Sequence, residues 1–138
     1  MDDAFLARVQ KDYPEYAFRV GKKFTFCPPK TIVFNLEEDH GSLLLLHELG
    51  HAICKHRDFY TDVQRLKMER AAWNKAKELA EKYGVLYDTE LVEDELDTYR
   101  CWLDTKSRCP VCKLTRYQTP DGKYHCPRCE SIITDIDN

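Results

Sequence analysis

The sequence predicts an α+β fold in two parts, from three observations. Short segments rich in β-branched and aromatic residues lie within residues 16–36. Helical periodicity dominates residues 42–104, and two Cys-x-x-Cys pairs lie within the last thirty residues. Strands followed by a run of helices are typical of an α+β domain. We therefore expect a short, mostly antiparallel sheet and three helices over residues 1–106, followed by a separate cysteine-rich domain over residues 107–138.

Three strands are predicted in the first third of the chain. Apolar and polar residues alternate over residues 16–20, and a second short strand over residues 24–26 follows a Gly-Lys-Lys turn at 21–23. The proline pair at 28–29 ends this second strand, because proline lacks the N–H that a sheet requires. Residues 31–36 form a third strand directly ahead of the first predicted helix.

That helix carries a His-Glu-x-x-His motif within an apolar run. Gly41 and Ser42 start it, with Ser42 as the expected cap. On a helix, residues four apart lie about 40° apart around the axis, so the imidazoles of His47 and His51 point toward one spot. The pattern predicts that both bind zinc and that Glu48 is the general base that activates water. A chance match on a solvated helix is disfavoured by the apolar flanks, since buried polar groups need partners.

A zinc peptidase needs a third protein ligand, and Glu69 is the best candidate. A second helix is predicted over residues 62–83, with Glu69 in the middle of its apolar face. That face is formed by Leu66, Trp73, Ala76, Ala80 and Tyr83. A metal ion explains a carboxylate there, and a buried ion pair with Arg65 is the alternative. His56 lies five residues after His51 and would point about 140° away on a continuing helix, so we expect it to interact with the last carbonyls.

The motif at 47–51, with Glu69-x-x-Ala72-Trp73-x-x-Ala76 downstream, resembles the ImmA/IrrE family of small bacterial and phage metallopeptidases. More broadly it resembles the gluzincins, which pair His-Glu-x-x-His with a glutamate on a second helix. The resemblance covers residues 24–83. It implies a zincin-like domain, the same three zinc ligands, the same general base, and cleavage of repressor-type transcription factors, often helix-turn-helix proteins. The cysteine-rich extension is a departure from this family.

We expect residues 31–36 to form the edge strand that binds substrate. Zincins usually carry a strand ahead of the motif helix whose free edge lines the cleft, and an extended peptide can add to such an edge. The substrate-binding residues of this prediction are Thr31, Ile32, Val33, Phe34 and Asn35.

The C-terminal segment predicts a second metal site. Cys109 and Cys112 form one Cys-x-x-Cys pair, and Cys126 and Cys129 form another, with thirteen residues between the pairs. Four thiolates so spaced form a tetrahedral zinc site, and the strand–turn–strand pattern between them, with its turn at 119–122, indicates a zinc ribbon. Two disulfides are the alternative, disfavoured by the expected compartment.

Composition indicates a reducing, cytoplasmic location. The chain has seven cysteines, an odd number, and it begins with Met-Asp-Asp rather than a basic leader with an apolar run. Its longest leucine run is four residues, too short to span a membrane. In the cytosol cysteine pairs bind metal more often than they form disulfides. Cys27, Cys54 and Cys101 are then free thiols, and we expect Cys54 to be a small core residue.

Charge patterning bears on the partners. A third helix is predicted over residues 89–104, and its acidic residues are expected to face solvent, with a docking surface for a basic partner as the alternative. Basic side chains are interleaved with aromatic ones in the ribbon, namely Arg108, Lys113, Arg116, Lys123 and Arg128 with Tyr117 and Tyr124. Such a pattern can bind single-stranded nucleic acid. Five basic residues are few for that role, so a ribbon that stabilises the protein or selects a protein substrate is favoured.

Together the motifs predict a zinc metalloendopeptidase with one catalytic and one structural Zn²⁺. Its expected substrate is an intracellular protein, either a helix-turn-helix repressor or another DNA-associated protein, and Tyr60, Tyr99 and His56 are candidates for stabilising the oxyanion. SprT-like proteases, which act on proteins crosslinked to DNA, also join the motif to a zinc ribbon. They use a third histidine, whereas this chain has none between residues 57 and 124. A non-catalytic zinc-bound module that binds protein or nucleic acid is the other alternative.

Overall fold

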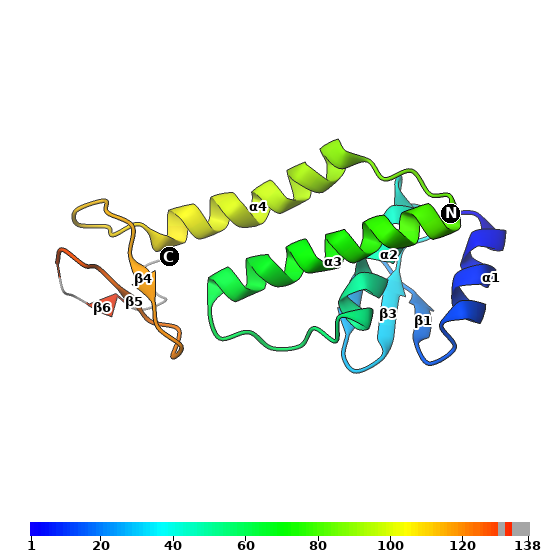
Figure 1. Ribbon diagram of the computed structural model, residues 1–138, viewed down its shortest axis with the longest axis horizontal. Helices are drawn as coiled ribbons and strands as arrows, with labels where there is room; N and C mark the ends of the chain where they lie inside the picture. The colour runs from blue at the N-terminus through cyan, green and yellow to red at the C-terminus, as the bar shows by residue number, and fades with distance from the viewer. Residues whose placement is uncertain (130–131, 134–138) are drawn as a thin grey trace. The chain divides into compact units, whose positions relative to one another are not determined.

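The computed structural model describes residues 1–129 and 132–133 (Figure 1). The described part is α+β, with four helices and two small three-stranded sheets. By its internal contacts the chain divides into two compact units, one of Met1–Arg57 with Met68–Thr89 and one of Asp58–Lys67 with Glu90–Asn138. In the described residues no helix has the length and apolar character needed to cross a membrane.

The first unit begins with a helix that the sequence analysis does not predict. Its elements are α1 (Asp3–Asp12), β1 (Ala17–Val20), β2 (Thr25–Cys27), β3 (Thr31–Phe34), α2 (Gly41–Ile53) and most of α3 (Asp62–Tyr83). The Asp2 side chain caps α1 by accepting a hydrogen bond from the Ala4 N–H at 3.0 Å. Only Phe5 and Val9 of α1 are buried, so its apolar pattern is weak in the sequence.

The sheet of this unit has the order β1-β3-β2. β1 pairs with β3 in parallel, with Ala17 opposite Thr31, and β2 pairs with β3 antiparallel, with Thr25 opposite Val33. The prediction of a mostly antiparallel sheet is therefore wrong for this sheet, in which one of the two pairings is parallel.

The prediction that residues 31–35 form an edge strand is also wrong. β3 is the central strand and is hydrogen-bonded on both sides, so Thr31, Ile32, Val33 and Phe34 have no free edge to offer a peptide, and Asn35 follows the strand. The alternation that buries Ile32 and Phe34 is the same for a central strand and for an edge strand. The position of β3 within the sheet depends on which other strands pair with it, and the sequence of β3 alone does not specify this.

Helix α2 supplies much of the core of the first unit. Its fully buried residues are Leu43, Leu45, Leu46 and Leu49. The predicted cap is wrong, because the residue at the N-cap is His40, in the left-handed conformation with φ 61° and with no side-chain capping bond. Ser42 already lies inside the helix.

The second unit contains α4 (Thr89–Ser107, counted from Glu90), the first turns of α3, and a sheet of β4 (Tyr117–Gln118), β5 (Tyr124–His125) and β6 (Ile132–Ile133). The sheet is antiparallel throughout, in the order β4-β5-β6. The sequence analysis predicts a domain boundary between residues 106 and 107, but α4 belongs to the same unit as the cysteine-rich segment that follows it. Arg116 explains this, because its guanidinium donates to the Lys106 carbonyl and its backbone N–H to the Ser107 carbonyl, both at 2.7 Å.

The first turn of α3 is also tied to this sheet through Asp62, which is buried. The Tyr124 hydroxyl donates to the Asp62 carboxylate, and the Lys106 ammonium lies 3.3 Å from it. The Asp62 backbone N–H donates to the Gln118 side chain at 2.7 Å. The two partners of this buried carboxylate, together with the bond from the Asp62 backbone, fix the start of α3 within the second unit.

Candidate metal centres

The first candidate centre depends on a close approach of two helices. Gly50 lies on α2 against Ala72 of α3, and a Cβ at residue 50 would come within 2.5 Å of the Ala72 carbonyl oxygen. Only glycine permits this backbone contact. The approach brings Glu69, one turn before Ala72, to the face of α2 that carries His47 and His51. The glycine of the His-Glu-Leu-Gly-His motif is therefore required by packing.

The structure brings the three predicted ligands together. Nε2 of His47 lies 3.0 Å and Nε2 of His51 lies 3.1 Å from the same Oε2 atom of Glu69. Zinc with ligands at roughly 2.1 Å in tetrahedral geometry separates its donor atoms by roughly 3.4 Å. Both nitrogen–oxygen separations are thus close to the spacing that a metal ion would require.

A second carboxylate lies beside the same pair of histidines. Glu48 offers an oxygen that forms a cluster with His47 and His51, in which all ligand atoms lie within 4.8 Å of one another, and such a cluster could hold a metal ion. We favour Glu69 as the ligand, because its Oε2 contacts both Nε2 atoms at hydrogen-bond distance. Glu48 then remains for another role.

The two carboxylates have opposite pKa shifts. Burial raises the pKa of Glu48, and the nearby histidines only partly offset this. Burial also acts to raise the pKa of Glu69, but hydrogen bonds from His47 and His51 outweigh it and hold the pKa far below its usual range. Glu69 is therefore a carboxylate suited to bind a cation, whereas Glu48 has an increased affinity for a proton.

Neighbouring side chains, the buried Trp73 and the half-buried His56, fix the orientation of both imidazoles. The His47 ring stacks on Trp73, with centroids 4.0 Å apart and an interplanar angle of 4°. His51 has its Nδ1 atom 2.8 Å from Nδ1 of His56. Since a ring that binds metal through Nε2 carries its proton on Nδ1, His51 can donate that proton to a neutral His56. Burial, followed by the nearby His51, lowers the pKa of His56 and favours this neutral form.

The position of His56 differs from the expectation that its side chain contacts the carbonyls at the end of α2. The helix ends in a Schellman motif, in which the N–H groups of Lys55 and His56 donate to the carbonyls of Ala52 and His51, each at 3.0 Å. Lys55 has φ 58°, the left-handed conformation that glycine usually supplies at this position. The chain therefore reverses at Lys55 and returns the His56 side chain to His51. A lysine gives no sequence signal for such a reversal.

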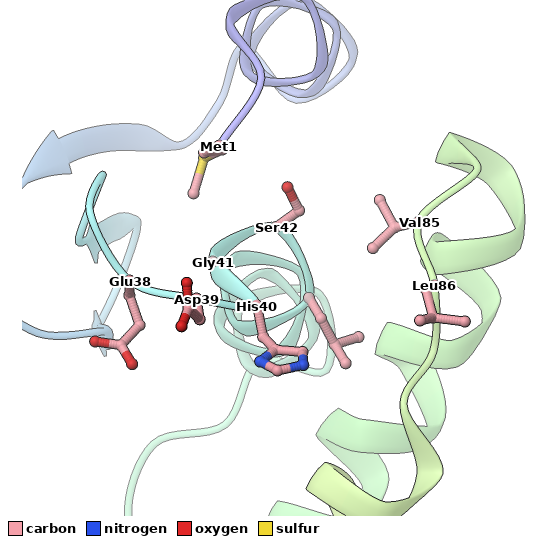
Figure 2. Close-up of a pocket in the computed structure, with 9 residues that line it drawn as sticks. Met1, Glu38, Asp39, His40, Gly41, Ser42, Val85 and Leu86 are labelled. Atoms are coloured by element: carbon pink, nitrogen blue, oxygen red, sulfur yellow. The ribbon is translucent and has the colours of Figure 1, made fainter.

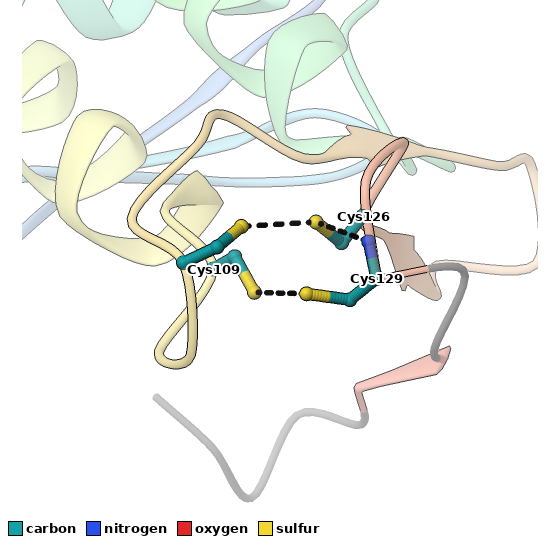
Figure 3. Close-up of side chains that lie close together, drawn as sticks. Cys109, Cys126 and Cys129 are labelled. Atoms are coloured by element: carbon teal, nitrogen blue, oxygen red, sulfur yellow. Dashed lines mark hydrogen bonds between the residues drawn. The ribbon is translucent and has the colours of Figure 1, made fainter.

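The second candidate centre is the four-cysteine cluster (Figure 3). The Sγ atoms of Cys112 and Cys126 lie 3.4 Å apart, and those of Cys109 and Cys129 lie 4.0 Å apart. Tetrahedral zinc with Zn–S bonds of about 2.3 Å has sulfur–sulfur separations of about 3.8 Å. All four cysteines are free thiols, so the spacing fits a metal site better than two disulfides, which require sulfur–sulfur bonds of about 2.05 Å.

The environment of Cys109 and Cys126 favours their thiolate forms. Hydrogen bonding from the Cys112 backbone N–H lowers the pKa of Cys109 to about 6. The Cys129 backbone N–H likewise lowers the pKa of Cys126, whereas hydrogen bonds with the Cys112 and Cys126 side chains raise the pKa of Cys129 to about 12. Backbone N–H groups aimed at sulfur stabilise the deprotonated form that binds metal.

Other predicted residues lie elsewhere. Tyr60 and Tyr99 belong to the second unit, so of the three oxyanion candidates His56 alone shares a unit with His47 and His51. The expectation that Cys54 is a buried core residue is wrong, because its side chain is exposed, as are those of Cys27 and Cys101.

A cavity of about 320 Å³ lies at the other end of α2, its N-terminal end (Figure 2). Its lining includes Met1, Asp39, His40 and Leu86, and Nε2 of His40 lies 3.3 Å from Oδ2 of Asp88. None of the candidate metal ligands lines it. We therefore assign it no part in the metal chemistry.

Comparison with protein families, with curated proteins and with solved structures finds no match to this chain. The functional argument consequently rests on the residues and their geometry.

Proposed function

We propose that the protein is a zinc-dependent endopeptidase with its catalytic centre at His47, His51 and Glu69. The observation that carries the proposal is the convergence of two imidazole Nε2 atoms on one carboxylate oxygen, at 3.0 and 3.1 Å, with a second, buried glutamate alongside. Three ligands of this chemistry leave a fourth position open, as catalytic zinc sites require. Bound Zn²⁺ supplies a Lewis acid that polarises a peptide carbonyl and lowers the pKa of water toward about 7.

Glu48 is the general base and then the general acid. Its carboxylate takes a proton from the attacking water and passes it to the leaving amine. Burial raises its pKa, which makes the carboxylate a stronger base than a solvated glutamate. The buried indole of Trp73 holds the His47 ring by stacking, and His56 orients the His51 ring through the Nδ1 contact.

The substrate peptide would lie along β2. With β3 paired on both sides, the free edges within the described residues are those of β1 and β2. β2 is favoured because Phe26 of this strand lines a cavity together with His56, the residue that contacts His51. A peptide could add to this edge through main-chain hydrogen bonds.

The four cysteines would hold a second, structural Zn²⁺ in the ribbon. A cysteine-rich segment of this size buries too little apolar surface to fold without a bound metal ion. The resemblance to ImmA/IrrE peptidases favours an intracellular repressor or another DNA-associated protein as substrate. The pairing of the motif with a four-cysteine cluster favours the SprT-like alternative, but the third converging side chain is Glu69 and not a histidine. Stimulation of cleavage by DNA would distinguish the two.

The test is cleavage of a proteome-derived peptide library, analysed by mass spectrometry, with zinc per chain measured on the same samples. Wild type should cleave peptides and carry two zinc ions. Glu48→Gln should keep both ions and lose cleavage, whereas Glu69→Gln should lose one ion and cleavage together. Glu81→Gln, an exposed glutamate on α3, is the matched control and should behave as wild type. A fully active Glu48→Gln protein would overturn the mechanism.

A further inference from the structure

A cavity of about 300 Å³ in the first unit lies beside the candidate catalytic centre. Its apolar walls include Tyr16, Phe26 and Pro29, and its remaining lining includes Lys55, His56 and Arg57. The volume falls at the lower end of the range for small-ligand pockets. It is large enough for one amino-acid side chain.

His56 connects this cavity to the catalytic centre. The same imidazole lines the cavity and lies 2.8 Å from His51, one of the proposed zinc ligands. Phe26 places the opposite wall on β2, the strand along which we propose that substrate extends. A peptide on β2 would therefore direct a side chain near the scissile bond into this cavity.

The charge of the lining is one-sided. Lys55 and Arg57 are exposed, and the lining contains no acidic side chain. Within residues 1–129 and 132–133, no carboxylate lies within 4.0 Å of either cation. The Schellman motif fixes the backbone of Lys55, which places its side chain at the cavity rather than along the helix. Two cations without acidic partners create a positive potential at the mouth of the cavity.

We propose that this cavity is the specificity pocket of the peptidase and that it receives an aspartate or glutamate side chain of the substrate. The proposal rests on the proposed function, because it assigns a substrate preference to the same site. The aliphatic part of the acidic side chain would pack against Phe26 and Pro29, and its carboxylate would pair with Lys55 and Arg57. Pairing with two unpartnered cations favours an acidic residue over its amide by roughly tenfold in kcat/KM.

The test uses full-length, zinc-loaded protein and paired peptides that differ only by Glu or Gln near the cleavage site found in the library. Wild type should cleave the Glu peptide with a kcat/KM about ten times that of the Gln peptide. In the double variant Lys55→Asn and Arg57→Gln this ratio should fall to about one. Asparagine is chosen for residue 55 because it tolerates a positive φ. Lys23→Gln, an exposed lysine of the same unit, is the control and should keep the wild-type ratio.

A charge-reversed variant sharpens the result. Lys55→Glu with Arg57→Glu should reverse the preference toward peptides with lysine or arginine at that position. Wild-type cleavage with a preference for an apolar side chain, or with no difference between Glu and Gln peptides, would overturn the pocket assignment and leave the peptidase proposal intact.

Binding separates this proposal from the proposed function. Fluorescence anisotropy would measure the affinity of Glu48→Gln protein for labelled library peptides that differ only by Glu or Gln, chosen whether or not wild type cleaves them. If wild type cleaves nothing, tighter binding of the Glu peptide that depends on Lys55 and Arg57 would support the pocket while the peptidase proposal fails. Equal binding of both peptides would overturn the pocket as well.

Discussion

The two candidate metal centres are built in different ways. In the first unit, the donor atoms lie on two helices, α2 and α3, and Glu69 is separated from His47 by 22 positions in the chain. A core of fully buried leucines holds α2 in place before any metal binds. In the second unit, the four cysteines lie within residues 109–129 on two tight turns, with little apolar core of their own. The packing of α2 and α3 positions the first centre. In the second, metal binding would hold together a segment that has little apolar core of its own.

This difference implies different responses to metal loss. A centre positioned by a core should keep its shape without metal, because its histidines can form hydrogen bonds to Glu69. A centre that organises its own loops should unfold when the metal leaves. A catalytic site benefits from the first arrangement, since preorganised side chains need little rearrangement during the reaction.

The largest expected effect is on the ribbon. Cys109→Ser with Cys126→Ser, or removal of metal by a chelator, should unfold the tail, because zinc contributes roughly 10–16 kcal/mol to the folding of small zinc-dependent domains. The helical circular dichroism of α1 and α2 should persist. Amide NMR spectra would show loss of dispersion for the tail residues alone, and Cys101→Ser, at an exposed thiol, is the control. A tail that stays folded without metal would contradict the comparison.

The next largest effect is expected from Gly50→Ala. The added Cβ would meet the Ala72 carbonyl at 2.5 Å and force α2 and α3 apart, at a cost of about 1–3 kcal/mol. The free energy of unfolding, measured by denaturant titration, should fall, and zinc should be lost from the first centre only. Gly41→Ala is the matched control, since its Cβ would have its nearest neighbour at 3.4 Å. Unchanged zinc affinity in Gly50→Ala would contradict the packing argument.

A smaller effect is expected from His56→Ala, which removes the partner of the His51 Nδ1 atom. Loss of such an orienting group typically weakens metal binding by about 10–100-fold. Competition with a zinc-sensitive dye would measure the change, which should be confined to the first centre. His40→Ala serves as the control, because His40 lies at the other end of α2. Equal zinc affinities of wild type and His56→Ala would show that His56 does not orient the His51 ring for metal binding.

The smallest effect concerns pH and the packing of α1. The Tyr83 hydroxyl donates to Asp12 at 2.6 Å, and this bond lowers the pKa of Asp12. A lowered folded pKa contributes stability that is present above the unfolded value of about 3.9 and is lost as pH falls through the folded value. Tyr83→Phe should therefore lower the melting temperature at pH 6, and its difference from wild type should vanish once the pH has fallen below the folded pKa of Asp12. A difference that persists at low pH would show that the hydroxyl acts through another contact.

The sequence predicted the parts of the centres that depend on local spacing. The bounds of the second predicted helix, 62–83, match α3, and the apolar position of Glu69 led to its contact with both histidines. These features follow from helical periodicity, which can be recognised from the residues of a single segment without knowledge of its partners. The four cysteines lie together as their Cys-x-x-Cys spacing predicts, since each pair is held by its own short turn.

The features that the sequence missed depend on partners far along the chain or on unusual backbone conformations. The central position of β3 is set by its pairing with β1 and β2, which its own residues do not specify. The return of His56 to His51 depends on a left-handed lysine, where glycine would have been the signal. Helix α1 buries too few residues to show a clear period.

The most direct test of the account is the number of zinc ions per chain, measured by native mass spectrometry in wild type and in two variants. If the two centres bind metal independently, wild type should carry two ions. Glu69→Gln should keep one, and Cys109→Ser with Cys126→Ser should also keep one. A single ion in wild type that is lost only with the cysteines would contradict the claim that His47, His51 and Glu69 form a metal centre.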